Sequence, residues 1–144
     1  MDIPSSLVSS IIEEGKMYYF SSTKLNTSEP HHFICIKRSD QVLLFSCCTS
    51  KFESMTKFVQ ARKLREETIV TVPSATDGTK LTKHTYINCN EDPIEIALPD
   101  FIERLKNNSV KSTGTLPPEY MEKILIGIRA SDMIDEEMKE FIGC

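Results

Sequence analysis

Two short apolar runs separated by a two-residue polar break constrain this chain more than any other feature. The runs are HHFICIKR at 31–38 and QVLLFSCC at 41–48, and Ser39 and Asp40 form the break. A break of this length predicts a tight hairpin, so we expect the runs to pair as adjacent antiparallel strands. Because both runs are almost continuously apolar, both strands are expected to be central in a sheet.

Segments on either side of this hairpin predict further strands and helices. Strands are expected at 17–22, 68–73, 84–90 and 94–98, with a last one in the polar stretch that ends at Gly114. Helices are expected at 5–14, 49–67, 99–108, 115–131 and 132–144, where apolar residues follow helical spacing. Short strands with inserted and appended helices predict an α+β fold, a small barrel with helical decoration.

Length and composition favour a single domain over residues 1–144, with helical extensions at both ends. No apolar run approaches the roughly 20 residues of a membrane span, and no secretion signal is evident, so a cytoplasmic protein is expected. The 5 cysteines include an adjacent pair and no C-x-x-C motif, which favours reduced thiols over a zinc site. Glycine-rich phosphate-binding motifs are also missing, so we expect neither a metal nor a cofactor.

The formal net charge of −4 is unevenly distributed along the chain. Residues 1–90 carry 11 Lys and Arg against 9 Asp and Glu, whereas residues 91–144 carry 6 against 12. The charge of residues 1–90 is therefore compatible with a basic face that binds nucleic acid. An acidic, solvated helical surface explains the second part equally well.

Adjacent histidines, His31 and His32, stand at the start of the first apolar run. Histidine transfers protons near neutral pH, which suits RNA cleavage through attack of the 2′-hydroxyl. Successive side chains of a strand point to opposite faces, so at most one histidine is expected to face a given pocket. The alternative is a pair of structural residues at the end of a sheet.

Hydroxyl groups and a lysine follow the second apolar run at Thr49, Ser50 and Lys51. Such a cluster can hold a phosphate through hydroxyls, backbone N–H groups and one cation. The alternative is an N-cap, in which Thr49 or Ser50 begins the next helix. Both roles are compatible. The neighbouring Cys47 and Cys48 lie in an apolar strand, which favours packing over a nucleophilic role.

Two further groups of basic residues are candidates for phosphate binding. Arg62 and Lys63 cluster with Lys57 and Arg65 on the segment after the hairpin, although flanking glutamates also fit a solvated helix face. Lys83 and His84, with Lys80, add cations near a later turn. Tyr18, Tyr19 and Tyr86 offer rings for base stacking, but aromatic residues in strands are more often core residues.

The order of these segments resembles the PemK/MazF-like toxin family. The similarity rests on GKMYYFSS, EPHHFICI, VLLFSCCTSK, LTKHTYINCN and STGTLPPEYMEKILIGI, and it covers most of residues 15–130. The family places an arginine at the start of the second strand and a hydroxyl residue after the third. The hydroxyl position matches Thr49, whereas the arginine position falls on His31 or His32.

The resemblance implies an SH3-like barrel and an endoribonuclease that cleaves single-stranded RNA, works as a homodimer and is neutralised by an antitoxin protein. His31, His32 and Thr49 are then the catalytic candidates, and Ser50, Lys51, Arg62, Lys63, Lys83 and His84 the binding candidates. Histidine lacks the permanent forked cation of arginine. A non-catalytic relative that binds protein or RNA is therefore the alternative.

Overall fold

The computed structural model describes residues 4–23 and 29–144. Its strands are β1 (Lys16–Phe20), β2 (His31–Arg38), β3 (Val42–Thr49), β4 (Ile69–Val72), β5 (Thr85–Asn88), β6 (Ile94–Ala97) and β7 (Lys111–Thr115). Its helices are α1 (Ser5–Ser10), α2 (Phe52–Arg62), α3 (Leu98–Lys106), α4 (Pro118–Ala130) and α5 (Glu136–Ile142), with a 3₁₀ turn η1 (Glu66–Thr68). The α+β class is confirmed.

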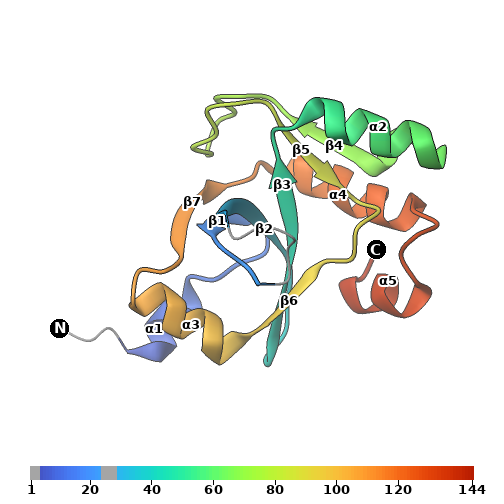
Figure 1. The fold of residues 1–144 in the computed structure, drawn as a ribbon. Coiled ribbons are helices and arrows are strands. Elements are labelled where there is room, and N and C mark those ends of the chain that lie inside the picture. The colour runs from blue at the N-terminus through green and yellow to red at the C-terminus, as the bar shows by residue number, and fades with distance from the viewer. Residues whose placement is uncertain (1–3, 24–28) are drawn as a thin grey trace.

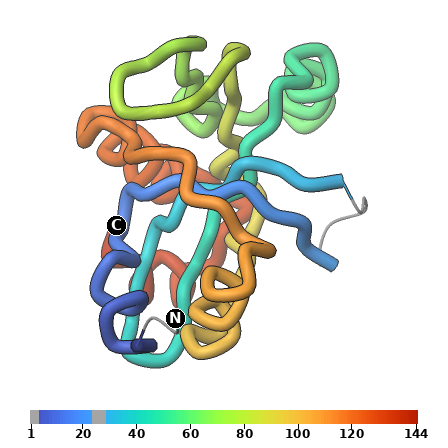
Figure 2. Tube along the Cα trace, turned by 90° about the vertical axis from the view of Figure 1, so that its left-hand side faces the viewer, coloured from blue at the N-terminus to red at the C-terminus, as the bar shows by residue number. Residues whose placement is uncertain are grey.

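The strands form an antiparallel sheet that curls into a half-barrel (Figures 1 and 2). The order of neighbouring strands is β4-β5-β3-β2-β1-β7, and β6 pairs with β3. The long strand β3 meets β5 at its end and β6 at its start. Irregular pairing after Met17 in β1 and after Cys35 in β2 bends the sheet further, because bulges increase local twist.

The predicted central hairpin is confirmed. β2 and β3 are antiparallel neighbours, with Phe33 opposite Cys47, and both are interior strands of the sheet. The connecting turn is closed by Ser39, whose backbone N–H donates to the Val42 carbonyl at 3.0 Å. The Ser39 hydroxyl also accepts a hydrogen bond from the Val42 N–H at 3.1 Å. This side-chain hydrogen bond stabilises the turn, which lacks the glycine that tight hairpins usually contain.

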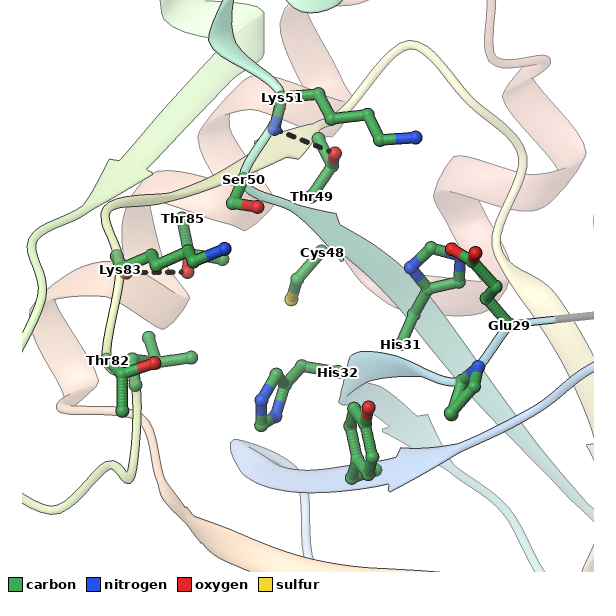
Figure 3. Close-up of a pocket in the computed structure, with 13 residues that line it drawn as sticks. Glu29, His31, His32, Cys48, Thr49, Ser50, Lys51, Thr82, Lys83 and Thr85 are labelled. Carbon is green, nitrogen blue, oxygen red and sulfur yellow. Dashed lines mark hydrogen bonds between the residues drawn. The ribbon is translucent and has the colours of Figure 1, made fainter. Parts of the chain in front are cut away.

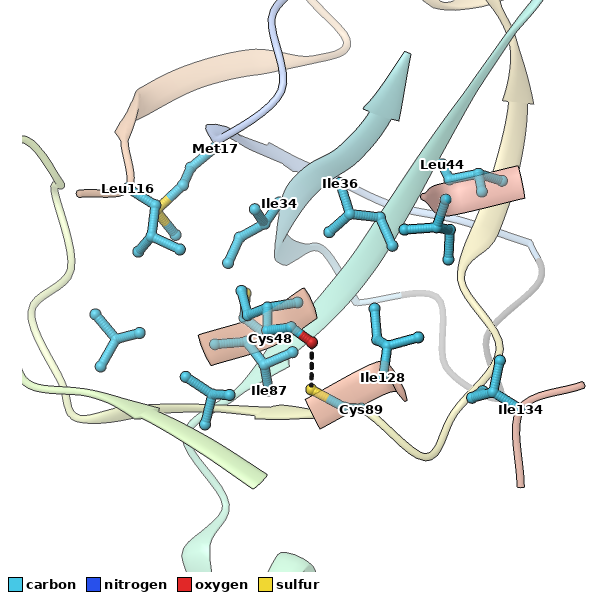
Figure 4. Close-up of a cluster of buried hydrophobic side chains, with 14 of the residues drawn as sticks. Met17, Ile34, Ile36, Leu44, Cys48, Ile87, Cys89, Leu116, Ile128 and Ile134 are labelled. Carbon is cyan, nitrogen blue, oxygen red and sulfur yellow. Dashed lines mark hydrogen bonds between the residues drawn. The ribbon is translucent and has the colours of Figure 1, made fainter. Parts of the chain in front are cut away.

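Two hydrophobic cores occupy the two faces of the sheet. One packs β2, β3 and β5 against α4 and α5, with Ile34, Ile87 and Ile128 near its centre (Figure 4). The other gathers Phe20, Phe33, Phe45 and Phe101 between the sheet and α3. The helix pairs α1–α3 and α4–α5 accordingly lie on opposite sides of β3 in Figure 1.

Several predicted helices are shorter than expected, among them the last, which spans Glu136–Ile142 rather than 132–144. The segment expected at 49–67 is helical only over Phe52–Arg62, because Lys63 adopts a left-handed backbone with φ of 52°. The segment expected at 5–14 ends at Ser10. None of the helices in the described part of the chain has the length and apolar character that a bilayer crossing requires.

The connection between β4 and β5, residues 73–84, folds back onto β7. Thr115 donates its N–H to the Gly78 carbonyl at 2.8 Å, and Lys80 donates to the Thr113 carbonyl at 3.1 Å. This approach needs glycine at 114, where a Cβ would lie 2.1 Å from the Gly78 oxygen. The connection is thereby fixed beside the first residues of β2.

Candidate functional site

The start of β2 and the end of β3 lie at one edge of the sheet because the strands are antiparallel. Phe33 pairs with Cys47, and continuing this register sets His31 level with Thr49. On the other side of β2, Tyr19 of β1 pairs with His32. The strand pairing thus brings His31 and His32 close to Thr49 and Ser50, the hydroxyl residues that follow the second apolar run.

These residues line an open pocket of about 340 Å³ (Figure 3). The strand ends supply His31, His32 and Thr49, and the turn into α2 supplies Ser50 and Lys51. The β4–β5 connection forms the facing wall with Leu81, Thr82 and Lys83, followed by Thr85 at the start of β5. Figure 3 shows Thr82 and Lys83 on one side of the pocket and Glu29 with His31 on the other.

His32 is held in place by two neighbours. Its ring lies against Tyr19, with centroids 4.9 Å apart, and its Nδ1 is 3.3 Å from the Thr113 hydroxyl oxygen. Burial, together with the nearby charge of His31, lowers the pKa of His32 from its usual 6.5. His32 is therefore neutral at neutral pH, and with a proton on Nδ1 its Nε2 is available as a base.

Both histidines line the same pocket, contrary to the expectation from strand alternation. They stand at the first two positions of β2, where the pocket wraps around the strand end. In Figure 3 the two rings lie on different sides of the strand and border the pocket from two directions. Two proton-transfer groups therefore adjoin one space.

The phosphate-binding candidates at the end of β3 are exposed to this space. The Thr49 hydroxyl oxygen accepts the Lys51 backbone N–H at 3.1 Å, which fixes the turn. The residue before α2 is Lys51, and no side chain caps the helix, so neither Thr49 nor Ser50 takes the N-cap role. Ser50 and Lys51 are exposed and line the pocket.

Lys83 joins this site, whereas His84 does not line it. The Thr85 hydroxyl donates to the Lys83 carbonyl at 3.1 Å and fixes the backbone beneath the lysine. Nδ1 of His84 instead accepts the Ser74 N–H at 3.2 Å, within the β4–β5 connection. Over the described residues, neither Lys51 nor Lys83 forms an ion pair, so both charges are available to an anion.

Arg62 and Lys63 lie at the far end of α2 and line a different pocket, of about 440 Å³, with Ser131 to Met133. The Arg62 guanidinium stacks on Phe58 at 4.2 Å. The structure thus separates these two binding candidates from the histidine pocket.

The paired cysteines are poor nucleophiles. Burial raises the pKa of Cys47 to about 12, and burial also raises the pKa of Cys48, which lines the pocket, well above 9. Both thiols therefore stay protonated at neutral pH, in keeping with the packing role favoured by their apolar strand. In the part of the chain that the structure describes, no three His, Cys, Asp or Glu side chains gather as metal ligands.

Sequence reasoning missed Thr82, Thr85 and Glu29 as lining residues. Thr82 and Thr85 flank Lys83 in a polar turn, which is a common pattern and identifies no site on its own. Their role follows only from the folding of the β4–β5 connection onto β7. Tyr19 was a stacking candidate and lies in the pocket wall.

Comparison with known proteins gives no match for this chain, either among protein-family models or among curated proteins.

Proposed function

We propose that this chain is an endoribonuclease that cleaves single-stranded RNA in the pocket at the start of β2, on an SH3-like barrel of the PemK/MazF type. The observation that supports the proposal most is the convergence of His31, His32, Thr49 and Lys83 on one open space. Proton-transfer groups beside unpaired cations and hydroxyls are what phosphodiester cleavage requires.

In the proposed reaction, Lys51 and Lys83 hold the scissile phosphate, and Thr49 and Ser50 donate hydrogen bonds to its oxygens. His32 Nε2 accepts the proton of the ribose 2′-hydroxyl. The 2′-oxygen then forms a bond to phosphorus while the bond from phosphorus to the 5′-oxygen breaks. His31 donates a proton to that leaving oxygen. The products are a 2′,3′-cyclic phosphate and a 5′-hydroxyl end.

The second candidate is a module that binds RNA or protein without cleaving RNA. It is favoured by the kind of basic group in the pocket: among the described lining residues, the basic side chains are lysines and histidines, with no arginine. A lysine neutralises a phosphate as a point charge. It lacks the planar, forked guanidinium of arginine, which can bind two phosphate oxygens at once.

The same resemblance supports three further proposals, namely a homodimer, neutralisation by an antitoxin protein, and a cytoplasmic location. The first two can be tested on the intact chain. Light scattering measures the oligomeric state, and co-expression with the product of a neighbouring reading frame measures relief of any growth arrest.

The decisive experiment incubates the purified chain with single-stranded RNA in the presence of a chelator. We expect fragments that end in a 2′,3′-cyclic phosphate. The matched substrate carries 2′-deoxyribose at the cleaved positions and should stay intact, and the matched protein is the double variant His31→Ala/His32→Ala. Saturable binding of RNA without fragmentation favours the binding module, and equal cleavage by the double variant overturns the proposed mechanism.

A further inference from the structure

β4 is the last strand at one end of the sheet, and its outer edge is open to an added strand. β4 pairs with β5 so that Ile69 lies opposite Asn88 and Thr71 opposite Tyr86. The Cys89 N–H donates to the Thr68 carbonyl at 2.8 Å, which places Thr68 in a hydrogen-bonded pair with β5. By antiparallel alternation, the backbone N–H and C=O of Thr71 and the C=O of Ile69 point away from β5, toward the open edge.

A groove lies on each side of this edge, and Ile69 and Thr71 line both. The groove under α2, of about 500 Å³, is walled by Phe52, Met55, Val59 and Tyr86. The groove on the α4 side, of about 370 Å³, is walled by Val70, Lys123 and Ile126. An added strand sends alternate side chains to opposite faces, so its two sets of side chains have a groove each.

Large apolar side chains are exposed on both sides of the edge. Phe52 is 59% exposed, although its ring lies 5.4 Å from that of Tyr86, and Ile126 is 54% exposed on α4. Apolar groups exposed on both sides of an unpaired edge are typical of a surface that a partner covers.

We propose that this edge binds an extended segment of another protein, which pairs with β4 and inserts alternate apolar side chains into the two grooves. This is recognition by strand addition, in which backbone hydrogen bonds give affinity and alternating pockets give specificity. The groove under α2 carries the carboxylate of Glu66 at the η1 end of β4 and, among its described lining residues, no basic side chain, whereas Lys123 accompanies Glu67 in the groove on the α4 side. The segment therefore carries a lysine or arginine at the end that meets η1.

A second copy of this chain fits the edge less well. In a β4–β4 pairing, the side chains on the α4 face come from Val70 and Val72, which are 4% and 0% exposed in their own core and cannot enter a neighbour's groove. The ladder is also limited to the four residues of β4, a small contribution to the roughly 800 Å² per partner of a stable interface. In a segment of another protein, the side chains on both faces of the added strand are free to enter the two grooves.

The test selects short random peptides, displayed on phage, against the immobilised full chain. We expect the selected peptides to be apolar at alternate positions, to carry a basic end, and to shift the amide signals of residues 69–72 in NMR spectra. Phe52→Glu and Ile126→Glu should each weaken their binding about tenfold or more, and so should N-methylation of alternate peptide amides. Leu7→Glu, at an equally exposed residue of α1, is the control and should leave binding unchanged.

Three results overturn the proposal. The first is that no peptide is enriched over the support without protein. The second is that the selected peptides bind Phe52→Glu and Ile126→Glu as tightly as the parent chain. The third is a dimer of the chain that Ile126→Glu dissociates, because the occupant of the edge is then a second copy. None of these readouts depends on RNA cleavage, so the outcome is independent of the function proposed for the histidine pocket.

Discussion

Nδ1 of His32 lies 3.3 Å from the hydroxyl oxygen of Thr113, a residue that is 81 positions further along the chain. The Thr113 carbonyl also accepts the Lys80 N–H at 3.1 Å. One residue of β7 therefore contacts the histidine on one side of the pocket and the connection that carries Lys83 on the other. This arrangement makes the orientation of His32 dependent on β7.

Thr113→Val removes the partner of His32 Nδ1 while keeping the shape of the side chain. We expect the rate of RNA cleavage to fall about fivefold, since a hydrogen bond of this kind contributes about 1 kcal/mol. Thr113→Ser retains the hydroxyl and should restore the rate. The ring-nitrogen shifts of His32 in NMR spectra report the tautomer, and they should change in the valine variant only. A rate loss of equal size in both variants contradicts a positioning role.

Replacing His32 by alanine is expected to reduce cleavage about 10²–10⁴-fold, the usual contribution of a general base or acid. His31→Ala should reduce it within the same range, since His31 is the proposed proton donor. Single-turnover measurements at saturating enzyme separate this loss from weaker RNA binding. His84→Ala is the matched control, because His84 bonds to Ser74 rather than lining the pocket, and it should cleave at the parent rate.

The lowered pKa of His32 predicts how both rate and stability depend on pH. Because the base must be neutral, the rate should rise with pH through a midpoint below 6.5. The unfolded chain binds a proton at His32 more readily than the folded chain does. The free energy of unfolding should therefore fall as the pH drops below about 6.5 and should level off below the folded pKa.

NMR titration of the His32 ring locates the folded midpoint directly, and denaturant unfolding measured across the same pH range tests the stability change. His32→Gln, which does not titrate, should flatten this part of the pH dependence of stability. A folded midpoint above 6.5 contradicts the prediction, because it requires the charged form to be stabilised in the pocket.

Lys51 and Lys83 should account for more of the RNA affinity than Arg62 and Lys63, although the sequence offers all four as phosphate ligands. The first pair lines the histidine pocket and the second pair lines a different one. Each phosphate contact that is lost should lower the slope of log K against log salt by about 0.7 for single-stranded RNA. The double variants Lys51→Ala/Lys83→Ala and Arg62→Ala/Lys63→Ala remove the same charge, and fluorescence anisotropy at several salt concentrations compares them. Equal slopes contradict the assignment.

The sequence predicted those parts of the fold that depend on short-range patterns. The β2–β3 hairpin followed from two apolar runs and a polar break, and its antiparallel register already implied that His31 and Thr49 share an edge. The end of α2 was not predictable, because Lys63 takes a left-handed backbone that lysine rarely favours. The pocket wall at Thr82 and Lys83 depends on the contact of Gly78 with β7, a long-range pairing without a local signal.

That contact supplies the last prediction, which concerns Gly114→Ala. Gly114 has φ of 122°, and a Cβ there would lie 2.1 Å from the Gly78 carbonyl oxygen, so the β4–β5 connection has to move away from β7. Gly143→Ala is a matched control, because Gly143 also has a positive φ, of 87°, but a Cβ there meets nothing within 4 Å. We expect a loss of about 1 kcal/mol in the free energy of unfolding for Gly143→Ala and more than about 3 kcal/mol for Gly114→Ala.

The difference between the two variants isolates the clash from the backbone strain. Hydrogen exchange should accelerate at the Thr115 and Lys80 amides in Gly114→Ala alone, because these amides bond across the contact. The RNA affinity of Gly114→Ala should also fall, because Thr82 and Lys83 move with the β4–β5 connection. If both variants lose the same stability and Gly114→Ala keeps the exchange rates of the parent chain, the connection is not fixed by β7, and the facing wall of the pocket must be held in another way.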